Sequence, residues 1–255
     1  MNLNITVAGQ GPDLVMLHGW SMHSAVWQPL VKVLSQQFTL HLVDLPGHGK
    51  SAWQQDALEI ETIVEMLASQ LPQKANWLGW SLGGLISIAM ASRHPQRVKK
   101  LILLAASPKF VQAEDWPYAV EKDVFIQFSD RLDSNQADTL HRFLLLQTRG
   151  AQHSRDTIRA LSYQLGVESP PVIEALKAGL DLLIDQDLRK ELAALTCPIQ
   201  MLLGDRDTLI PEAMLIMARR IQPKLQTVVF KGAGHAPFIS CADQCIQAIE
   251  QFINE

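Results

Sequence analysis

The stretch Trp77-Leu78-Gly79-Trp80-Ser81-Leu82-Gly83-Gly84-Leu85 decides the fold of this chain. The mostly apolar residues 76–80 predict a buried strand that runs directly into Ser81, and residues 82–92 predict a helix immediately after it. Gly79 and Gly83 suit a strained turn in which the strand and helix backbones approach too closely for larger side chains. A strand–turn–helix unit of this kind exposes the serine hydroxyl at the carboxyl-end edge of a parallel sheet.

The same stretch also allows a simpler interpretation. A Gly-x-Ser-x-Gly pattern arises often by chance, and a serine that precedes a helix can serve only as its N-cap. The strand before Ser81, the helix after it and the partner residues farther along the chain favour a nucleophile instead.

Outward from this turn, short apolar runs alternate with amphipathic helical runs. The expected strands are residues 14–18, 38–44, 76–80, 98–105, 199–203 and 227–230. The expected helices are residues 26–34, 60–71, 82–92, a helix that starts at Pro211, and 242–253. This alternation predicts an α/β fold in which helices cover both faces of a mostly parallel central sheet.

The alternation stops in the middle of the chain. Between about residues 108 and 192 the sequence has helical spacing and no convincing strand. The expected helices there are residues 121–132, 137–146, 154–165 and 172–183. We therefore expect a core made of residues 1–108 and 192–255, with residues 109–191 inserted as a helical lid.

Composition and charge limit the kinds of partner. The 255 residues are 47% hydrophobic and 19% charged, with a formal net charge of −4. This balance is ordinary for one domain with an insertion, and gives no global reason to expect binding to nucleic acid or to an anionic membrane. Residues 1–7 lack the features of a secretory signal, and no apolar run reaches the roughly 20 residues that span a bilayer. We expect a soluble, cytoplasmic monomer whose three cysteines stay reduced.

A serine hydroxyl is a poor nucleophile unless a base accepts its proton and a third group orients that base. His235 lies in a turn just after a strand and downstream of Ser81, which suits the chain order serine, acid, histidine. The acid is Asp205 or Asp207, which both follow the strand 199–203, and spacing does not choose between them. Asp44 is a weaker candidate because it precedes the nucleophile.

The negative charge that develops during acyl transfer needs backbone N–H donors. Leu82 opens a helix, so its amide lacks an intrahelical partner and the helix dipole favours an anion there. The loop after the first expected strand supplies the Trp20 amide as the second donor. The sequence has no cluster with metal-ligand spacing and no glycine-rich phosphate loop, so we expect chemistry without a metal or a cofactor.

Several longer stretches narrow the prediction. They are Leu17-His18-Gly19-Trp20, residues 40–47, residues 77–85, Arg142-Phe143-Leu144-Leu145-Leu146-Gln147-Thr148 and His235-Ala236-Pro237-Phe238-Ile239-Ser240. Together they resemble the pimeloyl-[acyl-carrier protein] methyl ester esterases of biotin synthesis, a family of α/β hydrolases. Gly-Trp-Ser-Leu-Gly-Gly combined with Arg-Phe-Leu-x-Leu-Gln-Thr is much more specific than the serine turn alone.

The resemblance implies an enzyme that hydrolyses the methyl ester of a pimeloyl chain on its carrier, which frees a carboxylate and ends elongation. It implies Ser81 as nucleophile, His235 as base, and Asp207 rather than Asp205 as acid. The residues that it implies for the oxyanion and substrate site, besides Ser81, are Trp20, Leu82, Phe143, Leu144, Leu145, Leu146 and Gln147.

The family meets acidic acyl carrier proteins with lid arginines, and the resemblance implies Arg142, Arg155 and Arg159 for this role. Residues 141–160 carry four arginines against the single acid Asp156, so a local basic patch is expected on a net acidic chain. The alternative is a solvated helix face whose arginines pair with neighbouring acids. Asp138 stands where the family can have another arginine, which would weaken or shift the patch.

Other functions share these residues. A broad short-chain carboxylesterase or a carbon–carbon bond hydrolase would use the same triad, and only the lid would distinguish it. A ligand receptor built on the same fold would bind its ligand without useful turnover.

Overall fold

A computed structural model describes residues 2–255 of the chain. The strands are β1 (Ile5–Ala8), β2 (Asp13–Leu17), β3 (Thr39–Val43), β4 (Ala75–Trp80), β5 (Val98–Leu104), β6 (Ile199–Gly204) and β7 (Gln226–Phe230). Within the described residues they form a seven-stranded sheet in the order β1-β3-β2-β4-β5-β6-β7. The β1–β3 pair is antiparallel and the other pairs are parallel, so the predicted α/β class with a mostly parallel sheet is confirmed.

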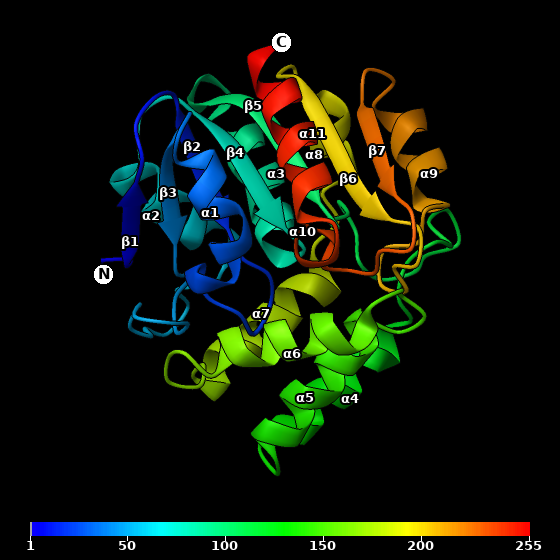
Figure 1. Cartoon of the computed structure of the whole chain (residues 1–255). Coiled ribbons are helices and arrows are strands. Elements are labelled where there is room, and N and C mark those ends of the chain that lie inside the picture. The colour runs from blue at the N-terminus through cyan, green and yellow to red at the C-terminus, as the bar shows by residue number, and fades with distance from the viewer. Residues whose placement is uncertain (1) are drawn as a thin grey trace.

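Helices cover both faces of this sheet (Figure 1). Those of the core are α1 (Gln28–Leu34), α2 (Ile60–Gln70), α3 (Leu82–Arg93), α8 (Arg189–Ala194), α9 (Met214–Ile221), α10 (Pro237–Ser240) and α11 (Ala242–Asn254), with 3-10 turns η1 (Ser24–Trp27) and η2 (Pro95–Arg97). Helix α1 packs against α11 on one face, whereas α3 packs against α2 and α8 on the other. Because α3 lies between the sheet and these two helices, it is buried on all sides over its first ten residues.

Burial explains which strands can be recognised from the sequence. Every residue of β4 and β6 is buried, as expected for central strands covered on both faces, and their apolar runs are correspondingly clear. Strand β1 was missed from the sequence. It is only four residues long and partly exposed at the edge of the sheet, so it lacks a continuous apolar run.

Four lid helices follow β5, and Figure 1 shows them together beyond the carboxyl ends of the central strands. They are α4 (Lys122–Leu132), α5 (Gln136–Gln147), α6 (Ser154–Leu165) and α7 (Ile173–Asp185), close to the expected ranges. The division into core and lid stays a prediction. The expected boundary between the end of the lid and the second core segment, at residues 191 and 192, falls inside helix α8. Met1 of the expected core lies outside the described residues.

None of the helices in the described chain combines the length and the apolar character that crossing a bilayer requires. Cys197, Cys241 and Cys245 are free thiols, as expected, and Cys245 is buried in α11.

Candidate active site

Ser81 occupies a strained turn between β4 and α3, with φ 53° and ψ −116°. A Cβ atom at Gly79 would lie 2.3 Å from the carbonyl oxygen of Gly83, and one at Gly83 would lie 2.3 Å from that of Leu17. Both glycines are therefore needed for close backbone approach. The Ser81 side chain makes no capping hydrogen bond to α3, which leaves its hydroxyl free for another partner.

That partner is His235. The Ser81 hydroxyl oxygen lies 2.9 Å from His235 Nε2, and His235 Nδ1 lies 2.7 Å from Asp207 Oδ2. The other Asp207 oxygen accepts the amides of Leu209 and Ile210, which fix the carboxylate. His235 is fully buried, and Ser81 keeps only 4% exposure. With Nδ1–H donating to the carboxylate, Nε2 is free to accept the serine proton.

Of the three candidate acids, the structure brings only Asp207 to His235. Asp205 accepts the Gly232 amide at 2.6 Å and lies 3.7 Å from Lys231 Nζ, so it braces the turn that precedes the histidine. Asp44 instead accepts the amides of Ser24 and Lys50, at 2.7 and 3.0 Å. Burial raises the pKa of Asp44. These amides and His18 together lower it by a larger amount, so the net shift of the pKa is downward.

The two expected oxyanion donors lie beside Ser81. Leu82 follows it directly, and the Trp20 loop packs against it, because a Cβ atom at Gly19 would lie 3.3 Å from the Ser81 Cβ. Neither the Leu82 nor the Trp20 amide has a hydrogen-bond partner among residues 2–255. Both N–H groups can therefore donate to a developing oxyanion.

A buried histidine holds the Trp20 loop in place. His18 Nδ1–H donates to the Gly19 carbonyl at 2.8 Å, and its Nε2 accepts the Leu45 amide at 2.9 Å. Burial, followed by the neighbouring His48, lowers the pKa of His18 to about 3. Burial likewise lowers the pKa of His48 to about 4. His18 therefore acts as a neutral bridge between two loops.

The end of α5 contacts the loops that carry His235 and Asp207. The Gln147 carbonyl accepts the His235 amide at 2.9 Å, and the Leu146 carbonyl accepts the Thr208 hydroxyl at 3.2 Å. The Gln147 side-chain oxygen is buried without a hydrogen-bond partner among the described residues. It is therefore available to a polar group of a ligand.

The expected substrate residues of α5 point in different directions. Phe143 and Leu144 are buried, and the Phe143 ring lies 4.6 Å from that of Trp20. Leu145 is 45% exposed and lies, together with Leu146, in a groove on the lid. Phe143, Leu144 and Gln147 are thus buried, and Phe143 lies against Trp20, whereas Leu145 faces outward.

Sequence reasoning missed several contacts that shape the site. Trp80 Nε1–H donates to the His235 carbonyl at 2.7 Å, and Trp20 Nε1–H donates to the Leu176 carbonyl of α7 at 2.7 Å. A Cβ atom at Gly179 of α7 would lie 2.8 Å from the Trp20 ring, so this glycine makes room for it. A glycine inside a helical pattern was the available signal for close packing.

The three expected docking arginines are all exposed. Arg142 pairs with Asp138 at 2.6 Å and Arg159 with Asp156 at 3.5 Å, so the alternative of pairing with nearby acids applies to both. Arg155 has no ion-pair or side-chain hydrogen-bond partner in the described part of the chain. In that same part, no group of three or more His, Cys, Asp or Glu side chains is arranged to hold a metal ion.

Comparisons with known proteins identify the family and the fold of this chain. Residues 12–240 match the model of the alpha/beta hydrolase fold family. The chain is 43% identical over 251 residues to the pimeloyl-[acyl-carrier protein] methyl ester esterase of Xanthomonas oryzae, and 45% identical to that of Xylella fastidiosa, with 98% of each chain covered. An esterase structure from Exiguobacterium antarcticum superposes with a TM-score of 0.89 at 22% identity, covering 99% of this chain and 96% of that one. This structural likeness supports the fold alone.

Proposed function

The chain belongs to the pimeloyl-[acyl-carrier protein] methyl ester esterases, a family of α/β hydrolases, and we propose that it hydrolyses the methyl ester of a carrier-bound pimeloyl chain. The products are the free carboxylate and methanol, and the resemblance implies a role in biotin synthesis. The observation that carries the proposal is the buried relay from Asp207 through His235 to Ser81.

Acylation begins when the Ser81 hydroxyl oxygen attacks the ester carbonyl carbon while His235 Nε2 accepts the hydroxyl proton. The carbonyl oxygen becomes an oxyanion, to which the Leu82 and Trp20 amides donate. Asp207 stabilises the imidazolium that forms. When the tetrahedral intermediate collapses, His235 returns the proton to the methoxy group, which leaves as methanol.

Deacylation repeats these steps with water. His235 accepts a proton from the water, and the resulting nucleophile attacks the acyl-Ser81 carbonyl. The second intermediate breaks the bond to the Ser81 oxygen, which takes its proton back from His235. The carrier keeps its thioester and gains a free carboxylate at the other end of the acyl chain.

The carrier protein is the proposed partner, and arginines on the exposed lid surface are the proposed contacts. Arg155 contributes most because its guanidinium is unpaired, whereas Arg142 and Arg159 must first exchange Asp138 and Asp156 for carrier carboxylates. Phe143, Leu144 and Gln147 are the proposed lining of the acyl site.

Methanol release from the carrier-bound methyl ester tests the function. Wild type should turn over many times, and Ser81→Ala should lose at least about a thousandfold in kcat, because no other group replaces the nucleophile. Ser69→Ala, an exposed serine on α2, is the matched control and should keep the wild-type rate. A Ser81→Ala enzyme that keeps its rate would refute the mechanism. A kcat/KM for free short esters equal to that for the carrier substrate would favour a broad esterase.

A second pair of variants tests the acid. Asp207→Asn should lower kcat by roughly a thousandfold or more. An asparagine amide favours the wrong tautomer of His235 and carries no charge that would stabilise the imidazolium. Asp205→Asn makes the same kind of substitution two residues earlier. It should lower kcat only a few-fold, since Asp205 accepts the Gly232 amide and does not contact His235. Equal losses in the two variants would contradict this assignment.

A further inference from the structure

Ser21, the residue after Trp20, is fully buried but has no hydrogen-bond partner within residues 2–255. Neither its hydroxyl nor its amide is bonded there. Buried polar groups are almost always bonded to protein, water or a ligand, and an unbonded one costs stability. The nearby His18, by contrast, bonds through both of its ring nitrogens. Ser21 is therefore an exception within a loop that is otherwise well bonded.

The backbone of Ser21 is also unusual. Its φ is 69°, in the left-handed region where a residue with a side chain is strained. Residues 19–22 form a turn in which the Met22 amide donates to the Gly19 carbonyl at 3.3 Å, and Ser21 occupies the third position. A positive φ at that position favours glycine or asparagine. Neither the strain nor the unbonded hydroxyl stabilises the fold, and strained residues of this kind gather at functional sites.

The turn lies beside Ser81. A Cβ atom at Gly19 would lie 3.3 Å from the Ser81 Cβ, and the Ser21 Cα lies within about 8 Å of the Gly19 Cα because only one residue separates them. The amides of Trp20, Ser21 and Leu82 and the Ser21 hydroxyl are all donors without an acceptor in the described chain. Unpartnered donors gathered in two adjacent segments suit a negatively charged ligand atom.

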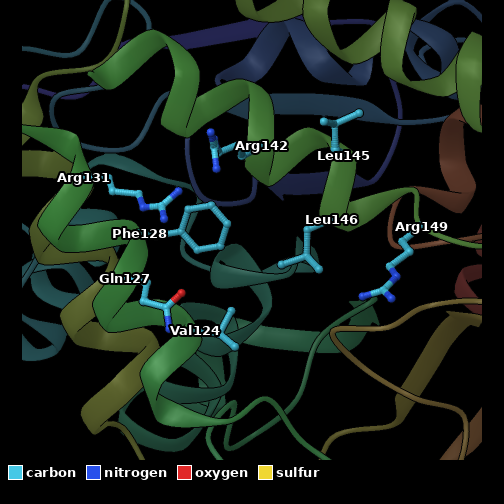
Figure 2. Close-up of a pocket in the computed structure, with 8 residues that line it drawn as sticks. All are labelled: Val124, Gln127, Phe128, Arg131, Arg142, Leu145, Leu146 and Arg149. Atoms are coloured by element: carbon cyan, nitrogen blue, oxygen red, sulfur yellow. The ribbon is translucent and has the colours of Figure 1, made fainter. Parts of the chain in front are cut away.

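The lid groove of about 500 Å³ between α4 and α5 does not supply this ligand atom. Figure 2 shows the residues that line it, which belong to α4, to α5 and to position 149 just beyond α5. None of them belongs to the turn at residues 19–22. A molecule in that groove would contact the lid helices, so the remaining candidate partner of Ser21 is the acyl group bound at Ser81.

We propose that the Ser21 hydroxyl is a third donor to the oxyanion that forms when Ser81 attacks the ester. The inference rests on the proposed function. The oxyanion can accept several hydrogen bonds at once, so the hydroxyl acts together with the Trp20 and Leu82 amides. The neutral ester carbonyl is a weaker acceptor, so this contact stabilises the transition state more than the bound substrate. The hydroxyl keeps its proton, and its bonding capacity is met only during the reaction.

Two substitutions separate the hydroxyl from the backbone. Ser21→Ala removes only the oxygen, whereas Ser21→Gly also removes the Cβ atom that strains the turn. Both should lower kcat about tenfold to a hundredfold with little change in KM, as expected for the loss of one oxyanion donor. The substrates are the carrier-bound methyl ester and p-nitrophenyl butyrate. Ser107→Ala is the matched control, because this buried serine donates to the Lys109 carbonyl at 2.7 Å, and it should keep the wild-type kcat.

An aliphatic trifluoromethyl ketone gives a second measurement that does not depend on turnover. The Ser81 oxygen adds to its carbonyl carbon, the hydroxyl proton passes to His235, and the ketone oxygen becomes an oxyanion that resembles the reaction intermediate. The inhibition constant should rise in both Ser21 variants by about the factor by which kcat falls. In Ser107→Ala it should stay at the wild-type value.

Thermal unfolding distinguishes this role from a structural one. Because the hydroxyl is unbonded in the free enzyme, both Ser21 variants should melt no lower than wild type while they lose activity. Unchanged kcat and inhibition constant in Ser21→Ala overturn the inference alone, as does a lower melting temperature of that variant, which would indicate a structural hydrogen bond. A wild-type enzyme that cleaves neither ester overturns the proposed function and the inference with it.

Discussion

Trp80 connects Ser81 to His235 through one side chain. It precedes Ser81 in β4, and its Nε1–H donates to the His235 carbonyl at 2.7 Å. Its ring also lies 4.9 Å from that of Phe238, which follows the histidine turn. The residue before Ser81 thus positions the backbone of His235.

Trp80→Phe should therefore lower kcat about fivefold to tenfold with little change in KM, because one buried hydrogen bond is lost while the ring contacts remain. Trp77→Phe is the matched control, since Trp77 is also a buried residue of β4 but its Nε1 has no partner within residues 2–255. The measurement is steady-state kinetics with thermal unfolding of both variants. Equal effects on kcat in the two variants would show that Trp80 acts only through packing.

At the residue scale, local sequence context predicted Ser81 and His235 but did not choose the acid. The serine turn and the downstream histidine were recognisable because their local strand and turn context is written in adjacent residues. The choice between Asp205 and Asp207 was not, because both follow the same strand and only the three-dimensional course of the turn brings one carboxylate to His235. Family resemblance favoured Asp207 before any geometry did.

At the element scale, long periodic segments were predictable and contacts between elements were not. The lid helices begin and end close to their expected limits because their apolar spacing extends over three turns or more. The outward position of Leu145 was unexpected, since it depends on how α5 packs against α4 and the core. The contact between α7 and the Trp20 loop was equally unpredictable from the sequence, because the two segments lie 156 residues apart.

Gly179→Ala tests this contact. The new methyl group would lie 2.8 Å from the Trp20 ring and should push the Trp20 loop, lowering kcat/KM about tenfold or more through the oxyanion donor. Helix propensity alone would favour alanine by about 1 kcal/mol, so the loss of activity should exceed any loss of stability. Kinetics and chemical denaturation together provide the measurement.

Gly166→Ala is the control for that substitution. Gly166 also lies in the lid, at the end of α6, but has a φ of −83° and its Cβ would find only ordinary contacts at 3.5 Å and beyond. It should keep wild-type activity. If Gly179→Ala also keeps it, α7 does not set the position of the Trp20 loop.

At the scale of the whole molecule, lid and core form one connected structure around the relay. Helix α5 meets the histidine loop through the Gln147 carbonyl, and α7 meets the Trp20 loop through the Leu176 carbonyl. The His235 loop and the Trp20 side chain are thus each held by a helix of the segment between β5 and β6.

The stability of the whole molecule depends on two histidines that are buried without charge. Burial lowers the pKa of His18 to about 3 and that of His48 to about 4, from an ordinary value of 6.5. His48 Nδ1–H donates to the Pro46 carbonyl, and its Nε2 has no partner in the described chain, as fits a neutral ring. In the unfolded chain both rings gain protons below pH 6.5, so the unfolded state binds more protons than the folded state.

The free energy of unfolding should therefore fall as the pH falls from 6.5 towards 4, by about 1.4 kcal/mol per pH unit for each of these protons. The substitution His48→Gln removes one of these two titrating groups. The slope of its unfolding free energy against pH should therefore be smaller in this window by the contribution of one proton, even if its stability at pH 7 is lower. Urea denaturation at closely spaced pH values measures both slopes. Parallel curves for wild type and His48→Gln would mean that His48 gains its proton equally in the folded and unfolded states.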